Sequence, residues 1–189
     1  MEHQETGKVW LAGAGPGDAG LLTRKAEQVL ESADVVVYDH LVGRDILARI
    51  RPDQKAVNVG KTSGHHPIPQ EKINQILVEE ARQGKQVVRL KGGDPFLFGR
   101  GGEELLKLKE AGIPFEVIPG VTSALAVPAY AGIPVTHRDY VSSLHIVTGH
   151  KKKNGELECD YPALVQAGGT LVFMMGVTAL PNIVKGLLD

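Results

Sequence analysis

The segment from Lys8 to Tyr38 restricts the fold of this chain more than any other stretch does. Lys8–Gly13 is an apolar run that predicts a buried strand, and the glycine-rich turn Gly13–Asp18 follows it directly. Leu21–Ala33 carries apolar residues at helical spacing, and Asp34–Tyr38 predicts a second strand. A strand, a glycine turn, a helix and a strand form a βαβ unit. We therefore expect an α/β protein with a mainly parallel sheet and ligands at the carboxyl ends of its strands.

The turn Gly13–Asp18 partly matches a dinucleotide-binding fingerprint, with Asp39 in the place of the acidic residue that contacts a ribose. Pro16 weakens this interpretation, because proline has no N–H group to donate to a pyrophosphate. Asp18 stands where Gly or Ala normally allows the helix to pack closely. No Walker spacing occurs, so an ATPase has no support. The turn therefore predicts a ligand whose chemistry stays open.

The longest glycine-rich stretch runs from Arg89 to Glu104. It follows the apolar run Gln86–Leu90, which predicts a strand, and it leads into Glu103–Ala111, which predicts a helix. Glycines leave backbone N–H and C=O groups accessible to a ligand, because no Cβ blocks the approach. The proline and the two phenylalanines of this stretch are poor choices for a solvated tether. We therefore expect a second ligand-facing turn here.

The rest of the chain continues the alternation of strands and helices. Gly132–Arg138 is a natural linker, because proline and glycine interrupt helices and strands and mark a crossing between two parts of a chain. We expect an N-terminal α/β domain over 1–134 and the start of a second α/β domain over 135–189. That second domain is expected to be incomplete as given, since about 50 residues are few for an independent core. The expected strands are Lys55–Val59, Pro114–Ile118, Ser143–Thr148 and Thr170–Met174, and the expected helices lie within 43–53, over Gln70–Gln83, from Pro119–Ala124 onward, over Tyr161–Ala167 and over Thr178–Leu188.

The overall composition argues against several classes of function. The formal net charge of −1 gives no general attraction to nucleic acid. The single cysteine, Cys159, excludes an internal disulfide and favours a cytoplasmic protein. Met1–Gly7 is polar and no apolar run is long enough for a membrane span, so neither a signal peptide nor a membrane partner is expected. His65 and His66 are adjacent but lack further ligands nearby, so no metal is expected.

Several motifs stand in a fixed order along the chain. They are Gly13–Asp18 with Leu21–Thr23, Tyr38–Val42, Val59–Lys61, Arg89–Glu104, Pro119–Ala124, Gly132–Arg138, Thr148–His150 and Thr170–Gly176. In this order they resemble the motifs of the tetrapyrrole methylase superfamily, over essentially residues 8–189. Arg89–Glu104 is similar to the stretch that separates the uroporphyrinogen-III C-methyltransferases from their relatives in that superfamily.

The resemblance implies a fold, a reaction and an assembly. The fold would be two α/β domains with S-adenosylmethionine (SAM) bound in a cleft between them, and the assembly a homodimer. The reaction would transfer methyl groups from SAM to C2 and C7 of uroporphyrinogen III, giving precorrin-2 for siroheme, cobalamin and, in some organisms, haem d1. The acceptor is a polyanion, so its site needs local positive charge. Candidate cations are Lys61, Arg89, Lys91, Arg100, Arg138 and Lys151–Lys153.

Individual roles follow from the resemblance by matching position. Asp39 and Lys61 match the proton acceptor and the proton donor. Arg100, Glu103 and Arg138 match positions that grip or activate the tetrapyrrole. Arg100 is counted with the catalytic residues, but it is expected to clamp carboxylates first, because an arginine pKa above about 12 makes a poor base. Simpler roles stay open: Asp39 as a cap after the second strand, and Lys61 as an anion contact. The expected SAM contacts are Pro16, Gly92, Gly93, Asp94, Leu97, Thr122, Ser123 and Met175.

Two other functions stay open. One is a truncated, non-catalytic module that binds SAM or a tetrapyrrole, which the expected incomplete second domain would fit. The other is methylation of a later corrin precursor at another ring position. Members of that kind usually lack the full runs Lys91–Pro95 and Gly99–Glu103, so this alternative ranks lower.

Overall fold

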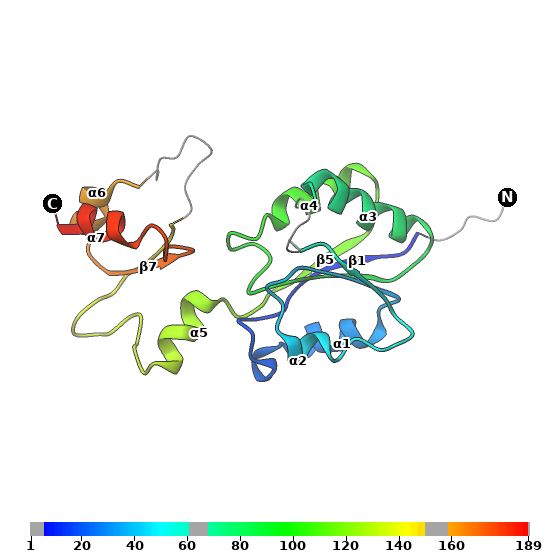
Figure 1. Ribbon diagram of the computed structural model, residues 1–189, viewed down its shortest axis with the longest axis horizontal. Coiled ribbons are helices and arrows are strands. Elements are labelled where there is room, and N and C mark those ends of the chain that lie inside the picture. The colour runs from blue at the N-terminus through cyan, green and yellow to red at the C-terminus, as the bar shows by residue number, and fades with distance from the viewer. Residues whose placement is uncertain (1–5, 61–67, 150–158, 189) are drawn as a thin grey trace. The chain divides into compact units, whose positions relative to one another are not determined.

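The computed structural model describes residues 6–60, 68–149 and 159–188 (Figure 1). The chain divides into two compact units, Met1–Ser123 and Ala124–Asp189. The domain boundary expected after residue 134 stays a prediction, because compactness alone does not define where a domain ends. In the described ranges, no helix is long and apolar enough to cross a lipid bilayer.

The first unit is built around a five-stranded sheet in the order β3-β2-β4-β1-β5. All of its strand pairings are parallel, which confirms the expected α/β fold class. Because the strands run in one direction, the segments that follow β1, β2, β4 and β5 leave the sheet at the same edge. The strands are β1 (Val9–Gly13), β2 (Val35–Tyr38), β3 (Lys55–Asn58), β4 (Val87–Lys91) and β5 (Phe115–Ile118).

Helices cover both faces of this sheet, with α1 and α2 on one side and α3 and α4 on the other (Figure 1). Successive side chains of a strand point to opposite faces. Val36 of β2 therefore packs in the core cluster that holds Leu30 of α1, while Val35 and Val37 pack in the cluster that holds Leu77 of α3. The helices are η1 (Ala19–Leu21, a 3₁₀ turn), α1 (Arg24–Ser32), α2 (Arg44–Leu47), α3 (Gln70–Arg82) and α4 (Gly101–Glu110).

The first helix begins later than its periodicity predicts, because two caps divide the segment. The Asp18 side chain accepts from Gly20 N and holds the 3₁₀ turn, and Thr23 Oγ1 accepts from Ala26 N at 3.2 Å and starts α1. A side-chain oxygen that satisfies a free N–H group at a helix start fixes where the helix begins. On the opposite face of the sheet, Gly84 follows α3 with φ 80°, which confirms the predicted glycine stop.

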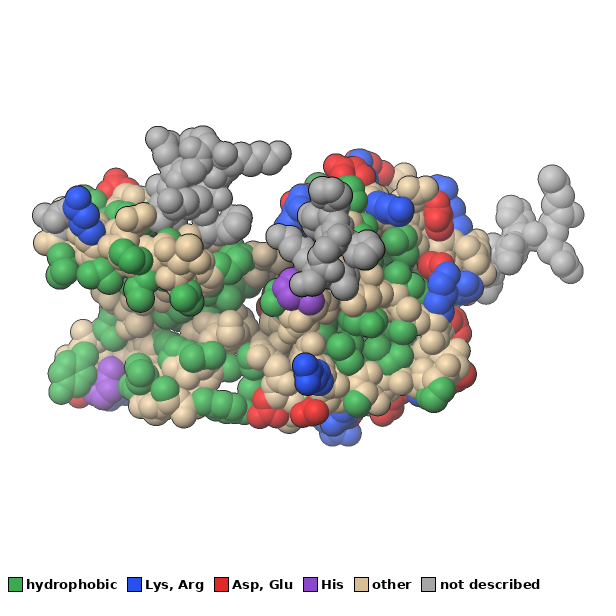
Figure 2. Space-filling view, in the orientation of Figure 1, with side chains coloured by type: hydrophobic (Ala, Val, Ile, Leu, Met, Phe, Trp, Pro, Cys, Tyr) green, Lys and Arg blue, Asp and Glu red, His purple; other side chains and the backbone are tan. Residues whose placement is uncertain are grey.

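The second unit is smaller and centres on the parallel pair β6–β7, with Leu144 opposite Thr170. The helices α6 and α7 approach closely: a Cβ on Gly186 of α7 would lie only 2.3 Å from the ring of Tyr161 in α6. Hydrophobic side chains reach the surface of this unit, as Figure 2 shows. The elements are α5 (Ser123–Tyr130), β6 (Leu144–Thr148), α6 (Tyr161–Ala167), β7 (Thr170–Met174) and α7 (Leu180–Leu188); the predicted bounds of α6 and β7 are confirmed.

Glu116 on β5 is held between two lysines. Lys25 donates a hydrogen bond to its Oε1, and Lys8 Nζ lies 2.8 Å from its Oε2. These hydrogen bonds lower the pKa of Glu116 from 4.5 to about 2. Because the pKa is lower in the folded state than in the unfolded state, the ionised carboxylate favours folding above pH 4.5, and this contribution is lost as the pH falls toward 2.

We expect the Glu116 carboxyl carbon to titrate with a midpoint near pH 2 in an NMR titration of the folded protein. Lys25→Ala should move that midpoint upward, because it removes the larger stabilising hydrogen bond. Lys107→Ala is the control, since Lys107 pairs with Glu110 instead. A wild-type midpoint at 4.5 would contradict the paired geometry.

Candidate functional site

Three glycines bring the carboxyl ends of β1, β4 and β5 into direct backbone contact. A Cβ on Gly13 would lie 2.5 Å from Gly120 Cα, and a Cβ on Gly120 would lie 2.2 Å from the carbonyl oxygen of Gly93. Gly93 N also donates to the carbonyl oxygen of Gly15 at 2.7 Å, and Gly15 N donates back to Gly93 at 3.1 Å. No side chain fits at this junction, so main chain forms the surface of this edge.

The loop after β4 closes on the first turn of α4 and holds two residues in a left-handed conformation. The carbonyl oxygen of Pro95 accepts from Gly101 N at 3.1 Å. Phe98 has φ 52° and Arg100 has φ 58°. This conformation costs a non-glycine residue about 1–3 kcal/mol, and residues held in it cluster at active sites and ligand-binding loops. The strained backbone is therefore a second reason, besides glycine content, to place the site at this loop.

Asp94 joins the loop after β4 to the turn after β5. Its Oδ1 accepts from Phe96 N at 2.8 Å, and its Oδ2 accepts from Gly120 N at 3.0 Å. Each carboxylate oxygen has a second lone pair available for a ligand. A contact between Asp94 and SAM stays a prediction, while the contact between the two loops is direct.

The loops of the first unit bring most of the predicted SAM contacts to one edge of the sheet. A Cβ on Gly92 would lie 2.5 Å from Leu41 Cβ, so the loops after β2 and β4 also touch. A Cβ on Gly43 would lie 2.5 Å from the carbonyl oxygen of Gly17, which places the first turn against the start of α2. The predicted contacts on these loops are Pro16, Gly92, Gly93, Asp94, Leu97 and Thr122, and the predicted contact Ser123 begins α5 directly after the last of them.

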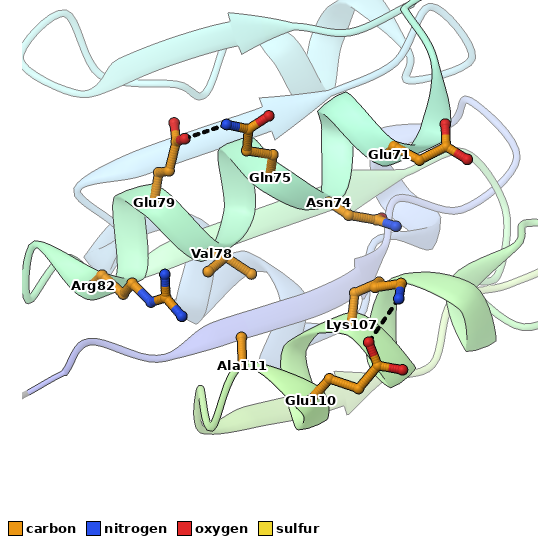
Figure 3. A pocket seen from close by; sticks show the side chains of 9 residues that line it. All are labelled: Glu71, Asn74, Gln75, Val78, Glu79, Arg82, Lys107, Glu110 and Ala111. Atoms are coloured by element: carbon orange, nitrogen blue, oxygen red, sulfur yellow. Dashed lines mark hydrogen bonds and ion pairs between the residues drawn. The ribbon is translucent and has the colours of Figure 1, made fainter.

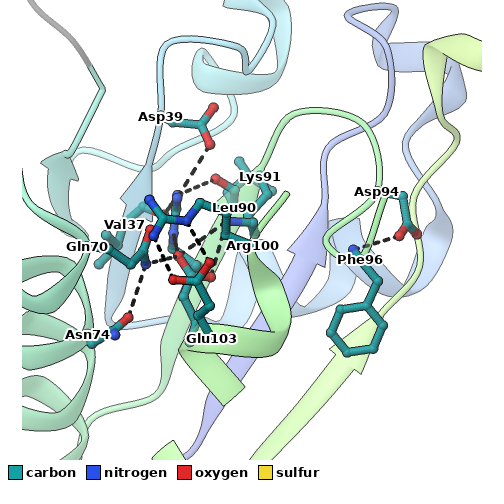
Figure 4. A network of polar contacts seen from close by, with 12 residues as sticks. Val37, Asp39, Gln70, Asn74, Leu90, Lys91, Asp94, Phe96, Arg100 and Glu103 are labelled. Carbon is teal, nitrogen blue, oxygen red and sulfur yellow. Dashed lines mark hydrogen bonds and ion pairs between the residues drawn. The ribbon is translucent and has the colours of Figure 1, made fainter. Parts of the chain in front are cut away.

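Asp39 follows β2 directly, and its side chain is 19% exposed. Its Oδ1 accepts from Leu41 N at 3.0 Å, which closes a short turn. Its Oδ2 lies 3.4 Å from Nη2 of Arg89, and Figure 4 shows the carboxylate above this polar network. Asp39 therefore stabilises the turn after β2, and its role as proton acceptor stays a prediction.

Arg89 and Lys91 are buried, which corrects the expectation that they supply positive charge to a polyanionic substrate. Arg89 is 3% exposed and Lys91 is 4% exposed. Both lie on the same face of β4 as Val87, two and four residues further along the strand, so they face the α3–α4 layer. There Glu104 of α4, fully buried, accepts from Arg89 Nε at 3.1 Å and lies 3.2 Å from Lys91 Nζ. These two cations neutralise a buried carboxylate, and the sequence pattern alone does not reveal Glu104.

Arg100 is exposed at the start of α4 and is paired with Glu103. Its Nε donates to Glu103 Oε1 at 2.8 Å and its Nη2 donates to Oε2 at 2.6 Å. This pairing raises the pKa of Arg100 and lowers the pKa of Glu103. A carboxylate of a ligand would therefore bind the remaining donors of Arg100 or displace Glu103.

The second unit has its own glycine contact at the carboxyl ends of its strands. A Cβ on Gly149 would lie 2.5 Å from Gly176 Cα, so the ends of β6 and β7 are joined by main chain. Met175, between β7 and Gly176, is half exposed with φ 55°. Arg138 also lies in this unit and is exposed. A site that these two residues share with the first unit stays a prediction.

Some predicted residues lie outside the described ranges, and their roles stay predictions. They are Lys61, His65, His66 and Lys151–Lys153. Among the residues that are described, no group of three or more His, Cys, Asp or Glu side chains could hold a metal ion.

A groove of about 450 Å³ lies between α3 and α4 (Figure 3). Within it, Gln75 donates to Glu79 at 2.6 Å and Lys107 donates to Glu110 at 2.6 Å. The groove belongs to the helix layer and not to the strand ends, so it is not the predicted ligand site. Its lining residues are Glu71, Asn74, Gln75, Val78, Glu79, Arg82, Lys107, Glu110 and Ala111.

The parallel sheet and the glycine-lined loops define an α/β protein with a candidate ligand site at the carboxyl ends of its strands. The chain belongs to the family of tetrapyrrole (corrin/porphyrin) methylases, whose family model matches residues 8–189. The expected superfamily is thereby confirmed.

Two curated relatives illustrate the match. The chain is 56% identical over 187 residues to siroheme synthase 2 of Serratia proteamaculans (strain 568), which covers 99% of this chain and 40% of that protein. It is 53% identical over 189 residues to the porphyrin biosynthesis protein HemD of Ruminiclostridium josui, which covers 100% of this chain and 37% of that protein. The chain thus spans about two fifths of the length of the curated relatives it matches.

Solved structures of similar proteins support the fold. Uroporphyrin-III C-methyltransferase from Thermus thermophilus, complexed with S-adenyl homocysteine, is 46% identical with a TM-score of 0.79, over 96% of this chain and 76% of that chain. The cobalamin biosynthetic enzyme cobalt precorrin-4 methyltransferase, CbiF, is 31% identical with a TM-score of 0.83, over 96% of this chain and 74% of that chain.

Proposed function

We propose that this chain carries a SAM-dependent C-methyltransferase activity that methylates C2 and C7 of uroporphyrinogen III and gives precorrin-2. The observation that carries the proposal is the backbone-lined edge at Gly13, Gly93 and Gly120. It occurs in a chain that is 46% identical to a uroporphyrin-III C-methyltransferase solved with S-adenyl homocysteine. That molecule is what SAM becomes after it has given up its methyl group, so it supports SAM as the donor.

The proposed site aligns two partners for an in-line displacement. SAM supplies an electrophilic methyl group on a sulfonium. The bond between the methyl carbon and a pyrrole carbon forms as the bond between the methyl carbon and sulfur breaks. Alignment at near-contact distance is the main contribution of the protein. The glycine edge provides backbone donors and acceptors without side-chain bulk, and Asp94 has lone pairs left for SAM hydroxyl or amine groups. Met175 would form an adaptable apolar wall for the adenine.

The remaining roles concern protons and carboxylates. After methyl transfer the ring must lose a proton, and Asp39, held by Leu41 N and Arg89, would accept it. Lys61 would act as proton donor. Arg100, Glu103 and Arg138 would position the acidic side chains of the tetrapyrrole, because arginine binds carboxylates through a planar, bidentate group. The proposal includes a cleft between domains 1–134 and 135–189, a homodimer and a cytoplasmic location.

The test is incubation of the protein that contains these 189 residues with uroporphyrinogen III and methyl-labelled SAM. We expect a tetrapyrrole product with two added methyl groups by mass spectrometry. A product without label would exclude the activity. Calorimetric SAM binding without turnover would instead support the non-catalytic binding module.

A second candidate is methylation of a later corrin precursor. It is favoured by the TM-score of 0.83 with cobalt precorrin-4 methyltransferase, although the identity is only 31%. Methyl transfer to a cobalt-containing corrin precursor, with none to uroporphyrinogen III, would establish this alternative.

Arg100→Ala should lower the turnover of uroporphyrinogen III while SAM binding stays largely intact. Loss of one charge-assisted hydrogen bond, about 1.5–3 kcal/mol, corresponds to roughly 10- to 150-fold. Steady-state kinetics gives the turnover, and calorimetry gives the SAM affinity. Arg51→Ala is the matched control, because Arg51 is also exposed and forms two hydrogen bonds, to Asp53, but precedes β3 at the amino edge of the sheet. Equal losses of turnover and SAM affinity would remove Arg100 from the acceptor side.

A further inference from the structure

We propose that Glu104 is a positioning residue, which holds Asp39 through Arg89 in the orientation that proton acceptance requires. A fully buried carboxylate on α4 would then affect the reaction without touching the substrate. The inference rests on the proposed function, because Asp39 is the proton acceptor only within that proposal.

The first step is the orientation of Asp39. Leu41 N holds one carboxylate oxygen at 3.0 Å, and a single hydrogen bond leaves the carboxylate free to rotate about its Cβ–Cγ bond. Arg89 Nη2, 3.4 Å from the other oxygen, restricts that rotation. The orientation of Asp39 therefore depends on where the guanidinium of Arg89 lies.

The second step is the position of Arg89. Its Nη1 donates to the carbonyl oxygen of Leu90 at 3.0 Å and contacts that of Val37 at 3.5 Å. Val37 is the register partner of Arg89 across the β2–β4 pairing. The Nε of Arg89 donates to Glu104 Oε1 at 3.1 Å. Because a guanidinium is planar, these donors together determine the direction in which Nη2 points.

The third step is the position of Glu104. Besides Arg89, it accepts from Lys91 Nζ at 3.2 Å and from Gln70 Nε2 at 3.1 Å, and Gln70 also donates to Asn74 of α3 (Figure 4). Glu104 is thus fixed from β4 and from α3. Without the negative charge of Glu104, the hydrogen bond from Arg89 Nε to residue 104 no longer joins two charged groups and weakens, so the guanidinium would be held less firmly and would orient Asp39 less strictly.

A purely structural role for Glu104 makes different predictions, and the chain provides a matched control. Glu80 is also buried, at 7% exposure, and it accepts hydrogen bonds from Lys55 and Lys85. Lys55 begins β3 and Lys85 precedes β4, so this cluster lies at the amino edge of the sheet, opposite Asp39. Glu80→Gln therefore makes the same chemical change without a path to Asp39.

The experiment is a double-mutant cycle in the protein that contains these 189 residues. We expect Glu104→Gln to lower kcat about 10- to 100-fold, as for a displaced reacting group, with the KM for SAM unchanged. In an Asp39→Asn background, Glu104→Gln should change kcat by less than about twofold, because coupled residues are not additive. Glu80→Gln should leave kcat unchanged in both backgrounds while lowering the unfolding midpoint.

Three outcomes would overturn the inference: Glu104→Gln lowers kcat equally in both backgrounds, it leaves kcat unchanged, or Glu80→Gln lowers kcat as much. If Glu104→Gln does not fold, Arg89→Lys tests the same link, because an ammonium keeps the charge but cannot contact both carboxylates in one plane. Absence of turnover in the wild type would refute the proposed function. In that case the link between Glu104 and Asp39 is tested by the unfolding midpoints of the two single variants and the double variant. The shifts caused by Asp39→Asn and Glu104→Gln should be non-additive, and additive shifts would overturn the inference.

Discussion

Replacement of Glu104 by alanine is expected to lower the free energy of unfolding by about 3–5 kcal/mol, the usual cost of removing one partner from a buried ion pair. Arg89 and Lys91 would remain in the interior with one negative group fewer. Burial already lowers the pKa of Lys91, and the charge of Arg89 lowers it further, while Glu104 opposes both effects. Removing Glu104 should therefore drive Lys91 toward its neutral form.

Urea denaturation followed by the fluorescence of Trp10, the single tryptophan, measures this loss. Glu103→Ala is the control, because the adjacent carboxylate is exposed and pairs with Arg100 at the surface. An exposed pair contributes about 0–1 kcal/mol, so this variant should unfold almost like the wild type. Equal losses for the two variants would show that burial does not decide the effect.

Replacement of Gly120 by alanine is expected to destabilise the first unit by at least about 3 kcal/mol, at or above the upper end of the usual cost of overpacking. The new Cβ would lie 2.2 Å from the carbonyl oxygen of Gly93 and 2.7 Å from Gly13 Cα. Both are backbone atoms, so no side chain can rotate to make room. The ends of β1, β4 and β5 would separate, and SAM affinity should fall at least about tenfold, the equivalent of 1.4 kcal/mol.

Gly102→Ala is the matched control for this prediction. Gly102 lies in α4, and a Cβ there would meet no atom within 4 Å. Alanine in a helix is favoured over glycine by about 0.5–1 kcal/mol, so this variant should be slightly more stable than the wild type. Chemical denaturation gives the free energy of unfolding of each variant, and calorimetry gives its SAM affinity. A Gly120→Ala protein as stable as Gly102→Ala would contradict the close contact at the strand ends.

The elements that the sequence predicted well are those whose signal is local. Tyr161–Ala167 and Thr170–Met174 have the predicted bounds, because helical periodicity and a short apolar run bounded by glycines act over a few residues. The start of α1 was predicted too early, because the caps at Asp18 and Thr23 compete with the apolar periodicity.

The candidate site divides in the same way. The glycine turns after the first and fourth strands could be predicted from the sequence, because the conformational freedom of glycine comes from its missing Cβ and does not depend on tertiary contacts. The burial of Arg89 and Lys91 could not be predicted, because charged residues at alternate strand positions give the same sequence pattern whether they face water or a helix. Glu104 lies 15 residues beyond Arg89 on another element, and no local pattern connects the two.

Order and spacing of residues alone thus specified a parallel α/β chain with glycine turns at its strand ends, because backbone preferences act between near neighbours. Only tertiary structure decided which charges are buried, which glycines touch and which non-glycine residues adopt a left-handed backbone. Those properties depend on the register of β4 against β2 and on the packing of α4 over the sheet, which bring distant residues within a few ångströms.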